Sequence, residues 1–181
     1  MKMIYHGSLM GGLKSNKPSV STHQKSFVYA TEDFFLAVLF CQKWNDFIFN
    51  VAYGDDGLLE ITERYEGALE EIFGGKGGFV YTLPKDSFAP DATRFEGEVV
   101  SSKEAEVRGC EKIDDILSKL TAADREGKIR LRRYPDRHPD IPDDDGDLAE
   151  EALALDKGDG KIIRYCLKLH PHLAEKLERK L

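Results

Sequence analysis

The sequence predicts an α+β protein, with short strands and helices over residues 1–120 and a small helical appendage at the C-terminal end. Three observations carry this prediction. Short runs rich in β-branched and aromatic residues alternate with turns of Gly, Pro and Ser. Two of these runs flank Gly-Asp-Asp-Gly at 54–57, which is a strong signal for a β-hairpin. A segment of prolines and aspartates at 132–147 separates this part from the C-terminal helical patterns.

Two apolar runs near the N-terminus predict strands at 3–6 and 26–30. The polar segment between them, 12–25, is rich in Gly, Pro and Ser, so we expect a loop or a poorly formed helix there. A largely buried helix is predicted over 32–44. Thr31 would serve as its N-cap, and the acidic residues that follow are favoured by the helix dipole.

The same patterns continue through the rest of the chain. They predict strands at 47–53, 58–65, 77–84, 94–101 and 105–113, and helical segments at 66–73, 114–126, 148–156 and 161–169. We therefore divide the chain into a first domain at 1–131, an acidic linker or loop rich in Pro and Asp at 132–147, and a helical tail at 148–181 that packs on the domain or on a partner.

Composition narrows the class of protein. The chain has 181 residues, 41% of them hydrophobic, which is enough to bury one real core. A net charge of −7 disfavours a dedicated nucleic-acid binder, although it leaves a local basic patch open. Apolar runs are too short to span a membrane, and we identify no export leader. Cys41, Cys110 and Cys166 lack paired spacing, so we expect reduced thiols in the cytoplasm.

Three short motifs partly match known ligand-binding motifs, but each lacks residues that such a site requires. The glycines around Lys76 lack the Ser or Thr and the following helix of a phosphate loop. The acidic run at 143–147 would put Ile141 and Ala152 in ligand positions of a calcium loop, so we interpret it as a solvated acidic loop. His170 and His172 lack further residues at metal-ligand spacing. We therefore expect no metal.

Polar residues occur within or at the end of three strand-like apolar runs. They are His6 in YHGS, Tyr29 in VYAT and Glu98 in GEVVS. Polar groups in such runs are costly to bury unless they are paired, so they tend to face a cleft. Each also has an ordinary structural explanation, and only their joint occurrence suggests a site.

At these three segments the sequence resembles the ADP-ribosyltransferase superfamily, in the diphtheria-toxin and poly(ADP-ribose)-polymerase-like branch with a His-Tyr-Glu triad. The resemblance covers roughly residues 3–120. It implies split, mostly antiparallel sheets with flanking helices. It also implies His6, Tyr29 and Glu98 as the catalytic triad, although Glu96 and Glu104 lie close enough in the sequence to be alternatives for the glutamate.

The resemblance further implies NAD as the substrate and a role for each residue. His6 would bond the adenosine-side ribose with Ser8 nearby, and Gly7 would hold the nicotinamide carboxamide through its backbone. Tyr29 would stack on the nicotinamide ring. Glu98 would bond the nicotinamide ribose and stabilise positive charge on the sugar as the glycosidic bond breaks.

Three functions follow as hypotheses. The first is transfer of ADP-ribose from NAD to a macromolecular or small-molecule acceptor that the sequence does not identify. The second is an RNA 2'-phosphotransferase of the same fold, which the acidic balance disfavours because an RNA substrate favours a basic face. The third is a non-catalytic domain that keeps the fold and uses the pocket or the tail for binding.

Overall fold

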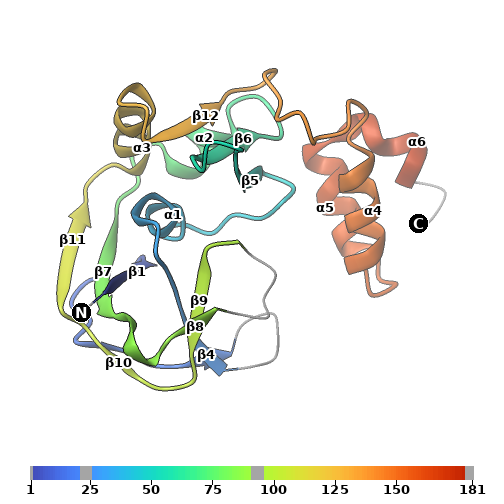
Figure 1. The fold of residues 1–181 in the computed structure, drawn as a ribbon. Helices are drawn as coiled ribbons and strands as arrows, with labels where there is room; N and C mark the ends of the chain where they lie inside the picture. The colour runs from blue at the N-terminus through green and yellow to red at the C-terminus, as the bar shows by residue number, and fades with distance from the viewer. Residues whose placement is uncertain (1, 21–25, 91–95, 178–181) are drawn as a thin grey trace.

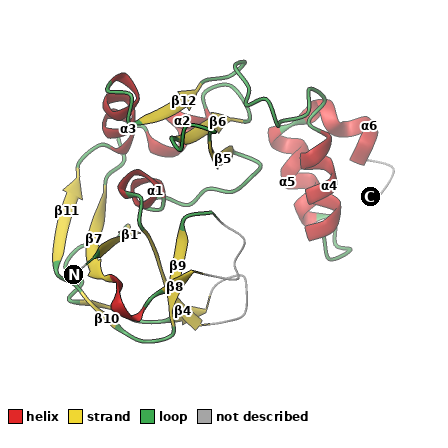
Figure 2. Ribbon diagram, viewed as in Figure 1, coloured by secondary structure: helices red, strands yellow, loops and turns green. Residues whose placement is uncertain are grey.

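The computed structural model describes residues 2–20, 26–90 and 96–177, and the fold is α+β with mostly antiparallel sheets and several helices (Figures 1 and 2). The largest sheet has seven strands in the order β11-β7-β1-β4-β9-β8, with β3 paired to β4. Its strands are β1 (Met3–Ser8), β3 (Ser19–Val20), β4 (Ser26–Thr31), β7 (Gly78–Pro84), β8 (Ala89–Pro90), β9 (Glu98–Ser101) and β11 (Gly109–Ile113). The strands predicted at 3–6, 26–30 and 77–84 are confirmed.

The centre of this sheet is unevenly paired. β1 pairs with β7 along its whole length, from Met3 opposite Pro84 to Ser8 opposite Phe79. Its register with β4 on the other side consists of a single pair, Tyr5 opposite Thr31. The C-terminal end of β1 and the N-terminal half of β4 therefore diverge, and side chains rather than ladder hydrogen bonds occupy the space between them.

A second sheet has the order β12-β6-β5, formed by β5 (Phe49–Tyr53), β6 (Leu59–Glu63) and β12 (Ile129–Arg132). The predicted hairpin is confirmed, because β5 and β6 are antiparallel around the 54–57 turn. β12 runs parallel to β6 and was not predicted. The buried Glu60 of β6 binds Arg130 and Arg132 of β12, so this strand is attached by ion pairs as well as by its ladder.

The first helix is shorter than the sequence predicts. α1 spans Phe34–Leu39 instead of 32–44, and its N-cap is Asp33 instead of Thr31. Asp33 Oδ1 accepts hydrogen bonds from Phe35 N and Leu36 N at 2.7 and 3.2 Å. Thr31 lies at the end of β4, and its hydroxyl oxygen accepts from Asp33 N at 3.0 Å. A carboxylate two residues farther along therefore performs the capping role.

Two other helices were predicted correctly. They are α2 (Ala68–Phe73) and α3 (Ile116–Arg125), and α3 is capped by Asp115. Together with α1 they bury their apolar faces in the largest core cluster, around Leu36, Leu69 and Leu120. The glycine turn between α2 and β7 is anchored as well. Gly75 N donates to Asp115 Oδ2 at 3.0 Å, and Lys76 Nζ donates to Glu71 O at 2.7 Å.

Two segments differ from their predictions. The segment 12–25, expected to be a loop or poor helix, contains β2 (Ser15–Asn16) and β3, although residues 21–25 lie outside the described part of the chain. The single strand predicted at 105–113 is divided into β10 (Ala105–Glu106) and β11, and β10 pairs with β2. The predicted strand at 94–101 begins at Glu98, and residues 94 and 95 are not described.

The C-terminal part is helical, as predicted. It consists of α4 (Gly146–Leu155), α5 (Lys161–Leu169), a short 3₁₀ turn η2 (Pro171–Leu173) and α6 (Ala174–Leu177). These helices share a separate core cluster that includes Phe47 of the preceding fold, so the tail packs on the rest of the chain (Figure 1). The proposed linker at 132–147 begins inside β12 and ends inside α4. No helix among the described residues is long and apolar enough to cross a membrane.

Candidate functional site

A cleft of about 450 Å³ opens where β1 and β4 diverge. Its walls come from the end of β1, the N-terminal half of β4 and the segment that carries β2 and β3. The predicted residues His6, Ser8 and Tyr29 all line it, together with residues that were not predicted, among them Met10, Asn16 and Lys17. Its size is in the range of small-molecule pockets.

His6 is held in one orientation by the neighbouring strand. Its Nδ1 lies 2.7 Å from the main-chain oxygen of Tyr29. A carbonyl oxygen can only accept, so Nδ1 carries the proton and Nε2 of the neutral ring is a hydrogen-bond acceptor. Burial lowers the pKa of His6, and the bond to Tyr29 only partly opposes this effect. The ring is therefore neutral at pH 7, with an acceptor nitrogen beside the cleft.

Tyr29 contributes two different groups. Its carbonyl oxygen orients His6, while its ring lies edge-on to the ring of Phe27, with centroids 6.2 Å apart. Val28 and Ala30 point into a core cluster on one face of β4, so by alternation Phe27 and Tyr29 point to the other face. The structure thus joins His6 to the main chain of Tyr29, and both residues line the same cleft.

Glu98 lies on the strand next to Tyr29 and does not line the cleft. β9 pairs with β4 so that Val100 is opposite Tyr29 and Glu98 is opposite Thr31. Because alternate residues share a face, Glu98 and Tyr29 are diagonal neighbours on the same face, a relation with a typical separation of about 7–8 Å. The side chain of Glu98 is partly buried.

The two alternative glutamates have different surroundings. Glu96 precedes β9, and Gly97 between it and Glu98 has a φ of 83°, so the strand alternation that would put both glutamates on one face does not extend to Glu96. Glu104 accepts a hydrogen bond from Ser15 Oγ, and Ser15 lines the cleft. Of the three, Glu98 alone is paired with the strand that carries Tyr29.

The packing of β1 requires a glycine at position 7, and the predicted role of the Gly7 backbone in holding nicotinamide stays a prediction. A Cβ at this position would lie 1.9 Å from Ala37 O and 3.0 Å from Cys41 N. The backbone of β1 therefore passes directly against α1 and the residues that follow it. Ser8, the next residue, uses its hydroxyl oxygen to accept from Met10 N at 3.1 Å.

Tyr81 and Asn16 shape the cleft and were not predicted from the sequence. Tyr81 is opposite His6 in β7, and its buried hydroxyl donates to Met10 O at 2.7 Å and accepts from Leu13 N at 3.2 Å. It thereby fixes the segment that forms one wall. Asn16 is 5% exposed, and its Nδ2 has no hydrogen-bond partner among the described residues. The strand alternation of FVYTLP was the available signal for Tyr81, whereas nothing local marks Asn16.

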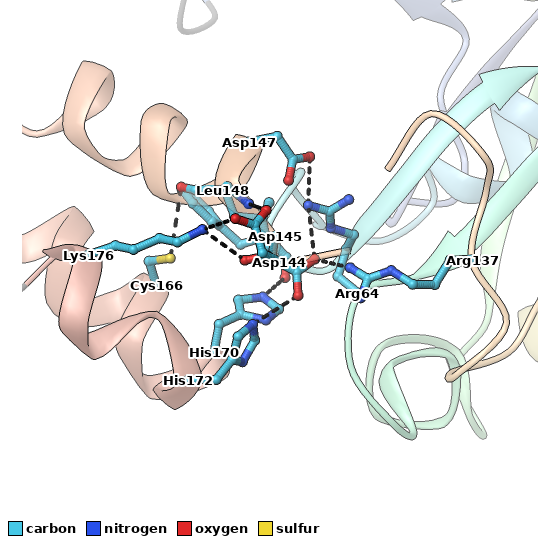
Figure 3. A network of polar contacts seen from close by, with 12 residues as sticks. Arg64, Arg137, Asp144, Asp145, Asp147, Leu148, Cys166, His170, His172 and Lys176 are labelled. Atoms are coloured by element: carbon cyan, nitrogen blue, oxygen red, sulfur yellow. Dashed lines mark hydrogen bonds and ion pairs between the residues drawn. The ribbon is translucent and has the colours of Figure 1, made fainter. Parts of the chain in front are cut away.

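The acidic run at 143–147 is only in part the solvated loop that we expected, because Asp143 and Asp144 are exposed whereas Asp145 is buried. Asp145 is 3% exposed and contacts Arg64, Arg137 and His172 (Figure 3). Arg64 in turn donates to Asp147 Oδ2 at 2.7 Å. Asp145 therefore supplies a buried counterion between the tail and the rest of the chain, and Asp147 supplies a partly exposed one.

The two histidines considered as a metal pair belong to the same region. His170 Nε2 donates to the main-chain oxygen of Phe47 at 2.7 Å, and His172 Nε2 lies 2.9 Å from Asp145 Oδ2. Burial lowers the pKa of His170, so its ring is neutral at pH 7. Within the described ranges there is no group of three or more His, Cys, Asp or Glu side chains suited to hold a metal ion.

Comparisons of this chain with protein-family models, with curated proteins and with solved structures found no match. The functional interpretation therefore depends on the residues around the cleft and on the resemblance of their sequence motifs.

Proposed function

We propose that this protein transfers ADP-ribose from NAD to an acceptor and releases nicotinamide. The observation that carries the proposal is the cleft between β1 and β4, which His6 and Tyr29 both line, with the neutral His6 ring held by the main chain of Tyr29 and Glu98 on the adjacent strand. The two larger sheets are separate, the seven-stranded one being antiparallel and the three-stranded one mixed, and this is compatible with the split arrangement that the resemblance implies.

The chemistry of each group suits this reaction. The Nε2 lone pair of His6 accepts a hydrogen bond from a ribose hydroxyl, which a protonated imidazole could not do. The aromatic rings of Phe27 and Tyr29 offer flat apolar surface for a base or for nicotinamide. A carboxylate at Glu98 stabilises the positive charge that develops on the ribose when the glycosidic bond breaks.

The test is release of nicotinamide from NAD by the purified protein, with and without cell extract as a source of acceptor. We expect Glu98→Gln to lower kcat by roughly a hundredfold or more while NAD binding is largely kept, because the carboxylate acts mainly on the transition state. His6→Ala should raise the Kd for NAD about tenfold through loss of one oriented hydrogen bond.

A matched control is Glu106→Gln, which changes an exposed glutamate paired with Arg108 on the surface and should leave both quantities unchanged. Absence of NAD binding in the wild type contradicts the proposal. Binding without turnover favours a non-catalytic module, and NAD turnover only with a 2'-phosphorylated RNA favours the phosphotransferase.

A further inference from the structure

Asp33 and Tyr53 meet beside the start of β9. The Tyr53 hydroxyl donates to Asp33 Oδ2 at 3.2 Å. The other oxygen of Asp33 caps α1, and its main-chain N–H donates to the hydroxyl oxygen of Thr31. Asp33 is thus fixed by the helix and by β4, and it presents its second carboxylate oxygen to a residue at the end of β5.

Tyr53 also contacts the turn that leads into Glu98. A Cβ at Gly97 would lie 2.9 Å from the Tyr53 hydroxyl oxygen and 3.2 Å from its ring atom Cε2. Gly97 also has a φ of 83°, which L side chains rarely adopt. The backbone immediately before Glu98 therefore runs against the edge of the Tyr53 ring, and it can do so only because residue 97 is glycine.

The electrostatic surroundings keep the Tyr53 hydroxyl a donor. Burial, together with the negative charges of Asp33 and Glu96, raises the pKa of Tyr53 above its ordinary range. The hydroxyl is therefore protonated at every pH at which the protein is expected to work, and the bond to Asp33 persists.

We infer that Asp33 and Tyr53 form a positioning pair that holds the Glu98 carboxylate in its place beside Tyr29. One member of the pair contacts the end of β4, and the other contacts the turn that leads into β9. Asp33 is bonded to Thr31, which is opposite Glu98, and Tyr53 packs on the residue that precedes Glu98. This inference rests on the proposed function, in which Glu98 is the group that stabilises the ribosyl cation.

The test compares Tyr53→Phe and Asp33→Ser with the wild type. Phe keeps the ring against Gly97 and removes the hydroxyl, while Ser keeps an N-cap oxygen and removes the one that Tyr53 binds. Each change should lower kcat for nicotinamide release about tenfold with the KM for NAD within about twofold, because small displacements of a catalytic group affect mainly the transition state. A purely structural role would change the melting temperature without this division between kcat and KM.

Tyr65→Phe is the matched control, because Tyr65 also donates to a carboxylate, Glu71 Oε2 at 3.0 Å, and Glu71 lies in α2. Hydrogen exchange of the amides of β9 supplies a second readout that needs no activity. Exchange there should accelerate in Tyr53→Phe and stay unchanged in Tyr65→Phe.

The two readouts separate the possible failures. If β9 exchange and kcat are the same in Tyr53→Phe and Tyr65→Phe, the inference is overturned even though the enzyme is active. If the wild type does not consume NAD, the proposed function fails. The exchange data then decide whether the pair fixes the turn before Glu98, and unchanged exchange in Tyr53→Phe would reject that as well.

Discussion

At the scale of single residues, the position of His6 connects its burial with the proposed binding of NAD. Burial lowers the pKa of the ring below the ordinary value of 6.5, and the carbonyl of Tyr29 selects the tautomer with a free Nε2. An imidazole with a lowered pKa stays neutral above 6.5 and becomes charged as the pH falls through the lowered value. Protonation then turns Nε2 from an acceptor into a donor. It also lowers the free energy of unfolding, because the folded protein favours the neutral ring.

If His6 binds NAD as proposed, the affinity for NAD should therefore decrease at low pH. We expect a constant Kd between about pH 8 and about pH 6.5, and a rise toward about tenfold per pH unit once the pH lies below the folded pKa of His6. Isothermal titration calorimetry over this range measures it, with thermal melts to confirm that the protein is folded. His6→Gln, which cannot titrate, should bind more weakly with a flat profile, and an equally flat profile in the wild type would contradict the assignment.

The sequence identified most of the residues that line one side of the cleft, and for a physical reason. His6, Ser8 and Tyr29 belong to short strands whose polar residues interrupt apolar runs, which is a local pattern. Asn16 lines the same cleft and Tyr81 fixes one of its walls, and each is placed by a strand pairing with a residue far away in the chain, Ala105 and His6 respectively. The alternation of FVYTLP predicts a strand at Tyr81, but the partner of each residue depends on the fold, and no local pattern marks Asn16 at all.

At the scale of elements, the close crossing of β1 and α1 explains why residue 7 is a glycine. The position that a Cβ would occupy is 1.9 Å from the carbonyl oxygen of Ala37, which belongs to the helix backbone and cannot rotate away. Gly7→Ala should therefore force β1 and α1 apart and destabilise the fold by about 3 kcal/mol or more. Thermal or denaturant unfolding measures this change.

Gly109→Ala is the control, because a Cβ there would meet its nearest atoms, those of Thr82, only at 3.5 Å. It lies in β11 of the same sheet, so the backbone context is comparable. We expect a change within about 0.5 kcal/mol for this variant. Equal stabilities of the two variants would mean that α1 does not press on β1 as described.

The elements that were missed share a dependence on distant partners. β2 and β10 are two residues long each and exist because they pair with one another. β12 does carry a local signal, since Ile129 and Leu131 alternate with arginines, but its place beside β6 is fixed by the buried Glu60. Longer elements such as β7 and α3 contain enough periodic residues to be recognised without knowledge of their neighbours.

At the scale of the whole molecule, the contact between the tail and the preceding fold depends on one buried carboxylate. The sequence offers four aspartates at 143–147 and no signal for which of them is buried, because their partners Arg64 and Arg137 come from other parts of the chain. The structure shows how far each of these aspartates is buried. Asp145 is almost fully buried at the N-cap of α4, whereas the side chain of Asp144 is 68% exposed and pairs with Lys176.

These two adjacent aspartates provide a matched test of what holds the tail in place (Figure 3). Asp145→Asn takes one counterion from the buried Arg64 and from the partly exposed Arg137, which should cost about 3 kcal/mol. Asn accepts the positive φ of 50° at this position, so backbone strain does not add to the loss. Asp144→Asn should cost less than about 1 kcal/mol, because its ion pair is solvated.

Denaturant unfolding of both variants at low and high salt separates the two cases. The small effect of Asp144→Asn should fade at about 1 M salt, where exposed charges are screened within about 3 Å, while the effect of Asp145→Asn should persist because water and salt do not reach the pair. Limited proteolysis gives an independent readout, since loss of the Asp145 contacts should make the segment before α4 the first site of cleavage. Equal and salt-sensitive effects at both positions would mean that apolar packing around Phe47, and not the buried charges, holds the tail on the fold.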